Sequence, residues 1–591
     1  MNVVNHLNVQ LTNTVGTMKS FKISPLVFIL AVVVVSSCNP LNKMKKNAGT
    51  IKYETVPVVL ETTKGEVPVA INVSFPKEYF NKNVIFEATP VLKYEGGEVA
   101  LKPVTLQGEN VQDNNKVITY ISGGSAQYSD KVPYSNEMMR SELEVRVKAY
   151  LKTKSGKSVD LPTVKLADGI VATSTLYTID PRAAWVGDNY VRVTSESKEA
   201  SIIYLINRSE VRSTELKKSE LKDFNKYLSD VKANSRKELK GITVSSYASP
   251  DGELDKNTVL SGDRGKTAQK FMTDEMKKSK MTETAKSDFL SVVSTPEDWE
   301  GFKKLMEASS IQDKELVLRV LSMYSDPEVR EKEIKNISKA FEEIADKILP
   351  QLRRSKLIAK VDLVGMSDDE LVQLANSNPD SLKLEELLRA ASLIQDNAKK
   401  IALYKKGTAK FSDWRAFNSL GYCLLKDGNV SEAKTAFESA KALQDNATIK
   451  NNLGVIALLE KRTDDALELF SSAMSAGEVA NYNLGVVYLI KGDYKSAVNS
   501  FGSANEYNAG LAKVLDGKND AALITLNNVK DDNAKVYYLK AIIGARTAKS
   551  DLVYNNLRTA VGKDPKMKEY AKKDAEFLKF ATDATFKSIV E

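Results

Sequence analysis

Two patterns of hydrophobic residues divide the chain. Between about residues 50 and 195, hydrophobic and polar residues alternate along short stretches such as 69–75 and 143–151. Alternation with a period of two is typical of strands with one buried face, and glycine-containing turns such as Gly123-Gly124 separate the stretches. Several short strands with regular turns predict an all-β sandwich over 50–195.

The next region, 196–366, predicts strands and helices in turn. Residues 201–206 and 242–246 have the alternation of strands, and the residues between them have the spacing of an amphipathic helix. Another strand is expected at the end of the region. This order predicts a central α+β domain, with a long insert of loops and helices near 280–349 in which Trp299 anchors the packing.

The segment after the second of these strands contains the turn glycine Gly252, followed by the run Asn257-x-x-Leu260-Ser261-x-x-Arg264. With this spacing, the segment resembles the C-terminal OmpA-like domain, which binds peptidoglycan. Ser261 is expected to cap a helix N-terminus. Arg264 would then lie near the start of a helix, where a guanidinium can bind a ligand carboxylate with two hydrogen bonds.

In that family, an aspartate and an arginine bind the diaminopimelate side chain of the stem peptide. Arg264 matches the arginine, but Ser249 stands at the aspartate position, and a hydroxyl cannot pair with an ammonium group as a carboxylate does. Asp251, two residues later, is the candidate substitute. The candidate peptidoglycan site is therefore Arg264, Asn257, Asp251 and Ser249. Two interpretations stay open, peptidoglycan binding and an OmpA-like fold that serves as a scaffold or binds another ligand.

From about residue 380 the sequence repeats. Gly421, Gly454 and Gly485 lie 33 and 31 residues apart, and alanines and phenylalanines follow each glycine at the same offsets. The pattern resembles tetratricopeptide repeats, which pack paired helices with small residues where the helices cross. The prediction is an all-α solenoid of about six repeats over 380–565, closed by a terminal capping helix over 566–591.

Solenoids of this kind have a concave groove lined by the first helix of each repeat. In the register of the family, the candidate peptide groove includes Arg415, Asn418, Tyr422, Asn451 and Tyr482. Asparagines can hydrogen-bond an extended peptide and tyrosines offer apolar contact area, so the resemblance implies protein partners in the envelope. The alternative is that these residues cover a solenoid packed against its own OmpA-like domain.

The N-terminal end carries an apolar run, 26–35, that is too short to span a bilayer of about 30 Å as a helix. A basic stretch precedes it and small residues follow, which is the layout of a cleaved secretory signal. The tetrapeptide that ends at Cys38 resembles a bacterial lipobox. The resemblance implies that 1–37 is a leader with a signal peptide, that Cys38 is lipidated, and that 38–49 is a linker. An ordinary signal with a chance cysteine is the alternative.

The residues after Cys38 also indicate a side of the membrane. Residues 39–46 contain no acidic side chain, and residue 39 is Asn39. Surface export of Bacteroidota-type lipoproteins is linked to an acidic stretch after the cysteine, and inner-membrane retention in other bacteria to an aspartate directly after it. We therefore expect a lipid-anchored protein of the outer membrane that faces the periplasm. The turn and the tryptophan-containing insert likewise resemble the OmpA-like variant of Bacteroidota envelope proteins.

The composition limits the kinds of ligand and of catalytic or metal site that the chain can have. The net charge of +8 is a mild basic bias that suits an anionic surface, but no dense basic stripe with aromatic residues indicates nucleic acid. The single histidine, His6, lies in the leader, and Cys423 has hydrophobic neighbours. A mature chain without histidine cannot form a histidine-based triad or a usual zinc site. We expect no enzyme, no metal and no cofactor.

These observations predict a non-enzymatic envelope scaffold that holds protein partners through its repeats and peptidoglycan through its OmpA-like domain. One alternative is a simple peptidoglycan tether in which the repeats are accessory. A cell-wall enzyme, which would need carboxylate-only catalysis, is the weakest alternative.

Overall fold

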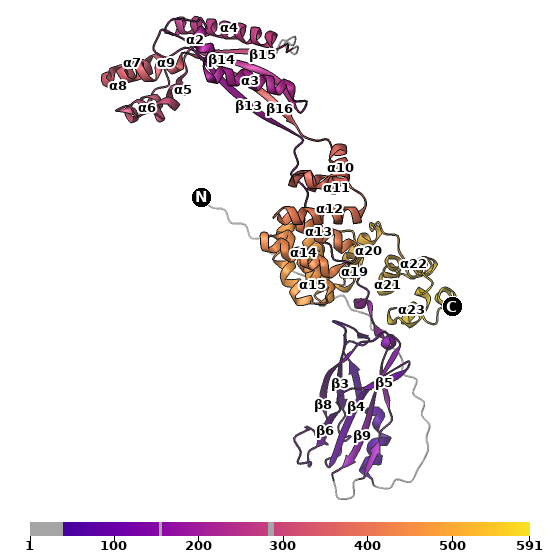
Figure 1. Cartoon of the computed structure of the whole chain (residues 1–591). Helices are drawn as coiled ribbons and strands as arrows, with labels where there is room; N and C mark the ends of the chain where they lie inside the picture. Colours follow the sequence, from indigo (N-terminus) through magenta and orange to yellow (C-terminus); the bar gives the residue numbers. More distant parts are fainter. Residues whose placement is uncertain (1–38, 153–156, 282–288) are drawn as a thin grey trace, which may run out of the picture. The chain divides into compact units, whose positions relative to one another are not determined.

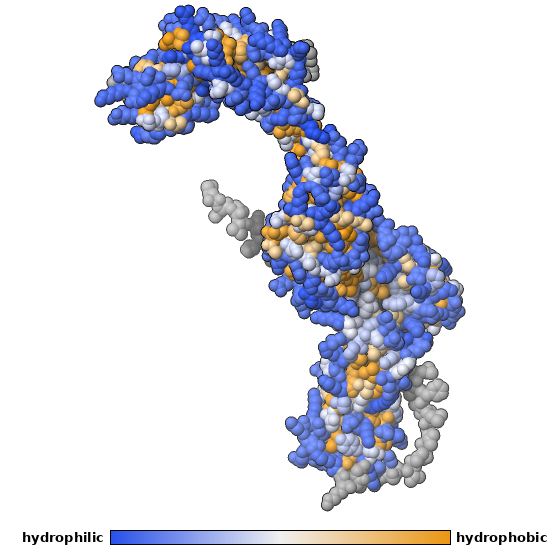
Figure 2. All heavy atoms as spheres, viewed as in Figure 1, coloured by the Kyte–Doolittle hydropathy of each residue, from blue (hydrophilic) through white to orange (hydrophobic). Residues whose placement is uncertain are grey.

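The structure is a computed structural model that describes residues 39–152, 157–281 and 289–591, so Cys38 and the leader lie outside the described residues. One unit comprises the described residues as far as Ile179 together with Gly485–Glu591, and the other comprises Asp180–Leu484 (Figure 1). Hydrophilic side chains cover most of the faces seen in Figure 2. None of the helices in the described ranges is long and apolar enough to cross a membrane.

The N-terminal part of the first unit is β-rich, as predicted. A three-stranded sheet has the order β1-β3-β8, and a larger sheet has the order β10-β9-β4-β6-β7, with β5 and β11 paired to its members. The ring centroids of Phe75 in β3 and Phe86 in β4 lie 5.2 Å apart, so the two sheets share one core. β2 and β12 form a short parallel pair. The bounds are β1 (Lys52–Thr55), β2 (Leu60–Glu61), β3 (Glu66–Phe75), β4 (Val84–Tyr94), β5 (Gly97–Ala100), β6 (Val104–Gly108), β7 (Lys116–Ile118), β8 (Gly124–Pro133), β9 (Ser141–Leu151), β10 (Ser158–Asp160), β11 (Val164–Asp168) and β12 (Ile170–Val171).

The alternation read from the sequence decides which side chains enter this core. In β9, Val145, Val147 and Ala149 are buried, whereas Arg146 and Lys148 between them are exposed. Such a strand has one face on the core and one in solvent.

Residues 39–49 of the predicted linker (38–49) are part of the fold. Residues Pro40–Lys46 form helix α1, which Asn39 caps by accepting a hydrogen bond from the Leu41 N–H at 3.1 Å. Leu41 and Met44, three residues apart on one face, are buried in the β core. Two apolar residues at helical spacing were too short a signal to predict this helix.

The first part of the second unit is a four-stranded sheet in the order β13-β16-β14-β15. β16 is antiparallel to both neighbours, and β14 is parallel to β15. α3 and α4 pack on this sheet, and Phe224, Met272 and Leu357 are fully buried there. The strand–helix order expected for 196–366 is present. The bounds are β13 (Val193–Ile203), α2 (Ser213–Leu216), α3 (Ser219–Ala233), β14 (Lys237–Tyr247), α4 (Leu254–Lys278), β15 (Leu290–Thr295) and β16 (Arg354–Val364).

The insert expected near 280–349 contributes a strand as well as helices. β15 pairs with β14, but Val292 and Val293 are both exposed, so the strand lacks the buried alternation by which strands are recognised. The helices enclose a separate small core around Phe302. Trp299, the expected anchor, lies at its margin with its ring centroid 5.7 Å from that of Phe302. The bounds are α5 (Trp299–Glu307), α6 (Lys314–Met323), α7 (Pro327–Asn336), α8 (Ser338–Lys347) and α9 (Leu349–Leu352).

The chain is helical from α10 onward. A contact between a glycine and a phenylalanine ring explains why the glycines recur at a regular spacing. A Cβ atom on Gly421 would lie 2.6 Å from the Phe437 ring, and one on Gly454 would lie 2.7 Å from the Phe470 ring. Glycine therefore lets the second helix of each repeat pack closely on the first. The bounds are α10 (Asp368–Ser377), α11 (Leu384–Leu393), α12 (Asn397–Lys410), α13 (Trp414–Lys426), α14 (Val430–Leu443), α15 (Ala447–Leu459), α16 (Thr463–Ser471), α17 (Glu478–Ile490), α18 (Tyr494–Phe501), α19 (Tyr507–Leu515), α20 (Asn519–Asn527), α21 (Ala534–Arg546) and α22 (Ser550–Lys563).

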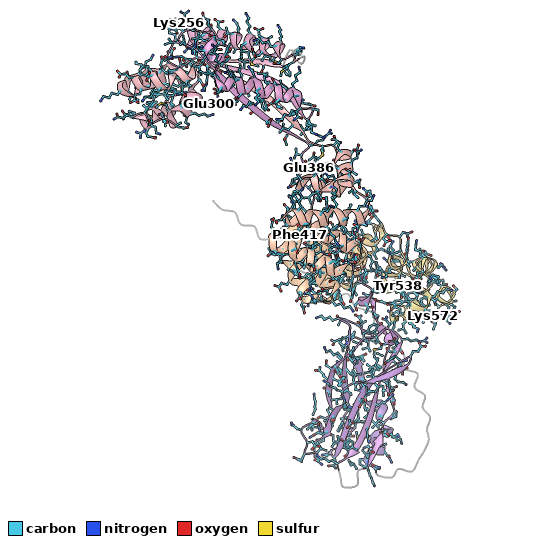
Figure 3. The ribbon with its side chains drawn as sticks, in the orientation of Figure 1. Lys256, Glu300, Glu386, Phe417, Tyr538 and Lys572 are labelled. Atoms are coloured by element: carbon cyan, nitrogen blue, oxygen red, sulfur yellow. The ribbon has the colours of Figure 1, made fainter. Side chains whose placement is uncertain are left out.

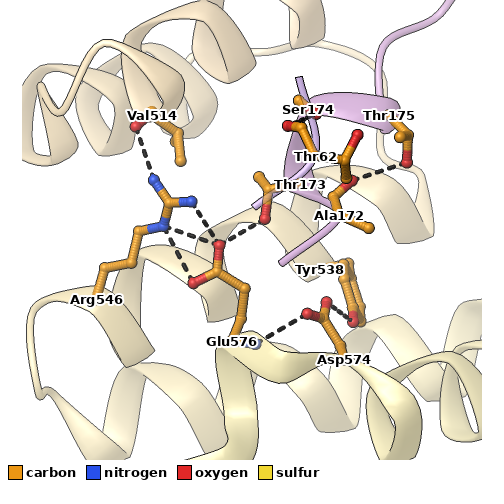
Figure 4. A network of polar contacts seen from close by, with 10 residues as sticks. All are labelled: Thr62, Ala172, Thr173, Ser174, Thr175, Val514, Tyr538, Arg546, Asp574 and Glu576. Carbon is orange, nitrogen blue, oxygen red and sulfur yellow. Dashed lines mark hydrogen bonds and ion pairs between the residues drawn. The ribbon is translucent and has the colours of Figure 1, made fainter. Parts of the chain in front are cut away.

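The C-terminal end forms three short helices where the sequence predicts one capping helix over 566–591. Asp574 interrupts the helix and caps the next one by accepting the N–H of Glu576 at 3.0 Å. Arg546 binds the carboxylate of Glu576, which also accepts the hydroxyl of Thr173 at 2.5 Å (Figure 4). The bounds are α23 (Met567–Lys573), η7 (Ala575–Phe580) and α24 (Ala584–Val590).

Candidate functional site

The four residues of the candidate peptidoglycan site lie together in the second unit, where β14 leads into α4. They line one cavity of about 820 Å³. The Asn257 amide donates to the carbonyls of Ser249 at 3.1 Å and Gly252 at 2.9 Å. Asn257 therefore holds the turn in shape and has a positioning role.

The expected capping role of Ser261 is wrong. α4 begins at Leu254, so Ser261 lies inside the helix, and its hydroxyl donates to the Thr258 carbonyl at 3.1 Å. Arg264 lies ten residues after the first residue of α4. The positive electrostatic field of a helix N-terminus, which favours a bound anion, is confined to the first turn. It therefore does not assist anion binding at Arg264.

Arg264 is fully buried, and backbone carbonyls accept its hydrogen bonds. Its guanidinium donates to Arg208 at 3.0 Å, Tyr247 at 2.9 Å and Leu205 at 3.3 Å. Burial lowers its pKa to about 10. Among the described residues, no carboxylate forms an ion pair with this guanidinium within 4 Å, and its carbon lies 5.2 Å from the centroid of the Tyr204 ring.

Ser249 and Asp251 both contact a second arginine, Arg353. Its guanidinium donates to the Ser249 hydroxyl at 3.3 Å and to an Asp251 carboxylate oxygen at 3.4 Å. Asp251 is therefore paired within the protein, which disfavours it as the substitute for the family's aspartate. Two arginines, Arg264 of α4 and Arg353 just before β16, therefore line the cavity beside the turn.

The insert supplies negative charge to the same cavity, which the sequence did not indicate. Glu297, Glu328 and Glu331 line it together with Lys335, which pairs with Glu331. Burial raises the pKa of Glu297, and the two nearby glutamates raise it further. The Trp299 indole donates to Glu297 at 2.9 Å and orients it. The cavity thus combines buried Arg264 and partly buried Arg353 with the partly buried carboxylate of Glu297.

The predicted groove residues lie on α13, α15 and α17, and another segment of the chain covers several of them. Residues 180–190, here called the strap, run without helix or strand before β13. The Asn452 amide donates to the Ala184 carbonyl at 2.8 Å and accepts the Ala184 N–H at 2.6 Å. Asn483 does the same for Arg182, with both distances 2.8 Å. Each asparagine binds both backbone polar groups of one strap residue.

Three of the five predicted groove residues contact the strap. The Asn451 amide donates to Arg182 at 3.0 Å, and the Asn418 amide donates to Ala184 at 3.3 Å. The Tyr482 hydroxyl donates to Asp180 at 2.7 Å. The alternative drawn from the sequence had these residues packed against the domain at 196–366, whereas the segment that they contact is the strap, which precedes that domain.

The other two predicted groove residues, Arg415 and Tyr422, form contacts elsewhere. Arg415 forms ion pairs with Glu385 at 2.5 Å and Asp413 at 3.0 Å. Glu385 in turn accepts the N–H of Asn189 in the strap at 2.6 Å, so Arg415 acts on the strap through Glu385. Tyr422 lies partly buried with the Lys426 ammonium 5.9 Å from its ring.

Asn452 and Asn483 were missed, although the sequence carries a signal for them. Each stands two residues before the repeat glycine, in the tripeptide Asn-Leu-Gly. Asn508 has the same offset from its glycine and, within the first unit, holds the backbone of Thr178 through both polar groups at 3.0 and 2.8 Å. An asparagine at a fixed place in successive repeats predicts a row of backbone-binding amides.

Comparison with known proteins bears on the helical region. The family model of the tetratricopeptide repeat matches residues 479–511. The chain contains a tetratricopeptide repeat. Repeats of this family imply a role in protein–protein interaction. No curated protein matches the chain.

Several solved structures are similar to parts of the chain. A Cut9–Hcn1 hetero-tetramer of the APC/C is 14% identical with a TM-score of 0.30, over 49% of this chain and 57% of that one. YrrB, described as a tetratricopeptide repeat protein with an unusual peptide-binding site, is 18% identical with a TM-score of 0.21, over 35% and 100%. A repeat protein from Parabacteroides merdae is 16% identical with a TM-score of 0.22, over 36% and 99%. At these TM-scores the similarities carry no argument about function.

Within the described ranges, no group of three or more histidine, cysteine, aspartate or glutamate side chains is arranged to hold a metal ion. Cys423 is buried, and burial raises the pKa of its thiol, which disfavours the reactive thiolate.

Proposed function

We propose that this chain is a non-enzymatic scaffold of the bacterial envelope, lipid-anchored at the periplasmic face of the outer membrane, with a central OmpA-like domain that binds peptidoglycan. The observation that carries the proposal is the cavity in which buried Arg264 and the carboxylate of Glu297 lie together. A ligand with both a carboxylate and an ammonium group would satisfy both charges.

The diaminopimelate end of a stem peptide is such a ligand. Its carboxylate fits Arg264 and Arg353, because a guanidinium offers parallel N–H donors to two carboxylate oxygens. Its ammonium fits Glu297, whose ionised form is disfavoured by burial until a cation arrives. Glu297 thus takes the role in which Ser249 departs from the family pattern.

The position of helix α1 supports the proposal of a lipid anchor at Cys38. It begins at Pro40, so an acylated Cys38 would hold the β-rich region against the bilayer surface with almost no linker between them. Lys43, Lys45 and Lys46 are exposed on this helix, and its first turn contains no acidic residue. Exposed lysines next to an acyl chain suit anionic headgroups.

The repeats distinguish a scaffold from a simple tether. A tether needs an anchor and a wall-binding domain, whereas this chain adds a solenoid of repeats of a class that binds proteins. A cell-wall enzyme would need a catalytic carboxylate pair, and two of the cavity carboxylates, Asp251 and Glu331, are already paired with Arg353 and Lys335.

Two experiments test the proposal. Labelled fatty acid should enter the chain expressed in its host and should be absent from the Cys38→Ala variant. The purified chain should sediment with peptidoglycan sacculi, and Glu297→Gln should weaken this at least about 10-fold, since one charge-assisted contact is lost. Glu300→Gln, an exposed position on α5 labelled in Figure 3, is the matched control and should bind like the wild type. A wild-type chain that stays in the supernatant would refute the wall-binding part.

A further inference from the structure

The asparagines under the strap form one continuous hydrogen-bonded row. Asn483 donates to Asn451 at 2.9 Å, Asn451 to Asn452 at 3.1 Å, and Asn452 to Asn418 at 2.8 Å. All four side chains are fully buried. We call this set the asparagine ladder. It spans three helices, α13, α15 and α17, and two strap residues complete its hydrogen bonds.

The ladder recognises backbone rather than side chains. The two strap residues that it holds, Arg182 and Ala184, are bound through their N–H and C=O groups. Tyr482 contacts two strap side chains: it donates its hydroxyl to Asp180, and its ring centroid lies 3.6 Å from the guanidinium carbon of Arg182. The ladder therefore suits an extended segment with aspartate and arginine two residues apart.

An empty ladder would be unstable. A buried amide that loses its partner costs about 1–3 kcal/mol, and removal of the strap would strip partners from several amides at once. The strap also binds intramolecularly, so its effective concentration is in the range of millimolar or more. A separate peptide must therefore outcompete a ligand that is always present.

We propose that the strap is an intramolecular ligand that covers the asparagine ladder, and that releasing it exposes a binding site for an extended segment of the Asp-x-Arg type. The inference builds on the scaffold role proposed above, because it makes partner binding conditional on release of the strap. It is independent of the cavity around Arg264, whose test is sacculus binding.

The test uses the full chain and a labelled peptide of residues 180–190, with binding followed by fluorescence anisotropy. The double variant Arg182→Pro, Ala184→Pro removes the two N–H donors of the strap. It should bind the peptide at least about 100-fold more tightly than the wild type does, since the competing ligand is weakened. A peptide N-methylated at the positions of Arg182 and Ala184 should not bind. Adding Asn452→Ala and Asn483→Ala to the double variant should abolish binding.

Two results would overturn the inference. One is a wild-type chain that binds the peptide as tightly as the proline variant. The other is a proline variant with wild-type helical circular dichroism that binds no peptide. Hydrogen exchange on the wild type covers the case in which the variant fails to fold. The amides of Arg182 and Ala184 should exchange as slowly as those of α15, and rapid exchange there would also contradict the proposal.

Discussion

The side chain of Asn452 forms two hydrogen bonds with the backbone of Ala184, at 2.8 Å to its carbonyl and 2.6 Å from its N–H, although the two residues are 268 positions apart. Asn452 also donates to Asn418. The pair therefore joins the strap to the repeats through a fully buried amide, which has no access to water as a replacement partner.

Asn452→Ala should lower the free energy of unfolding by roughly 2–3 kcal/mol, because it leaves the N–H of Ala184 and a ladder oxygen unpaired in a buried site. Urea denaturation of the full chain measures this change. Asn376→Ala, at an exposed position of α10, is the control and should shift stability by less than about 0.5 kcal/mol. Equal effects of the two substitutions would contradict the structural role of the ladder.

Gly485→Ala should also destabilise the chain. A Cβ atom there would lie 2.6 Å from the Phe501 ring. Either the ring must move or the two helices must separate, which should lower the free energy of unfolding by about 1–3 kcal/mol. Gly562, in α22, has no heavy atom within 4 Å of the position that a Cβ would take, so Gly562→Ala should stabilise by about 0.5–1 kcal/mol through helix propensity. Thermal unfolding of both variants checks the opposite signs.

The buried carboxyl group of Asp574 predicts that the free energy of unfolding depends on pH. It is buried, accepts the Tyr538 hydroxyl at 2.6 Å, and burial raises its pKa to about 6 from an ordinary value of 3.8 (Figure 4). The folded state therefore favours the protonated acid. Its contribution to stability is complete below about pH 3.8 and is lost as the pH rises through about 6.

Asp574→Asn removes this titration while keeping a neutral side chain of the same shape. Relative to the wild type, the variant should gain on the order of 3 kcal/mol of stability between about pH 4 and pH 7.5. Denaturant unfolding of both chains at several pH values measures the difference. A difference that does not change with pH would show that Asp574 has an ordinary pKa.

The sequence predicted those parts of the fold in which one repeating pattern recurs. Alternation located the strands of the β-rich region, because each inward side chain meets the same core. The repeat glycines were found because each faces an aromatic ring at the same offset, as Gly421 does Phe437. β15 and α1 were missed, since the strand lacks a buried face and the helix has only two inward residues.

The candidate sites were predicted less completely, because their partners come from distant segments. Arg264 was found from a local spacing, yet Glu297 reaches the same cavity from the insert. The strap has no hydrophobic period, and its contacts are hydrogen bonds from its backbone to amides more than 230 residues away. Spacing along one segment cannot reveal such pairs.

The central claim is that the cavity of Arg264 and Glu297 binds a group with both a carboxylate and an ammonium. Isothermal titration of the full chain with two soluble stem peptides tests it most directly. One peptide carries diaminopimelate and the other carries lysine, which lacks the extra carboxylate. The account predicts that the diaminopimelate peptide binds at least about 10-fold more tightly, and that Glu297→Gln weakens its binding while Glu300→Gln does not. Equal affinity for the two peptides, or no binding of either, would contradict it.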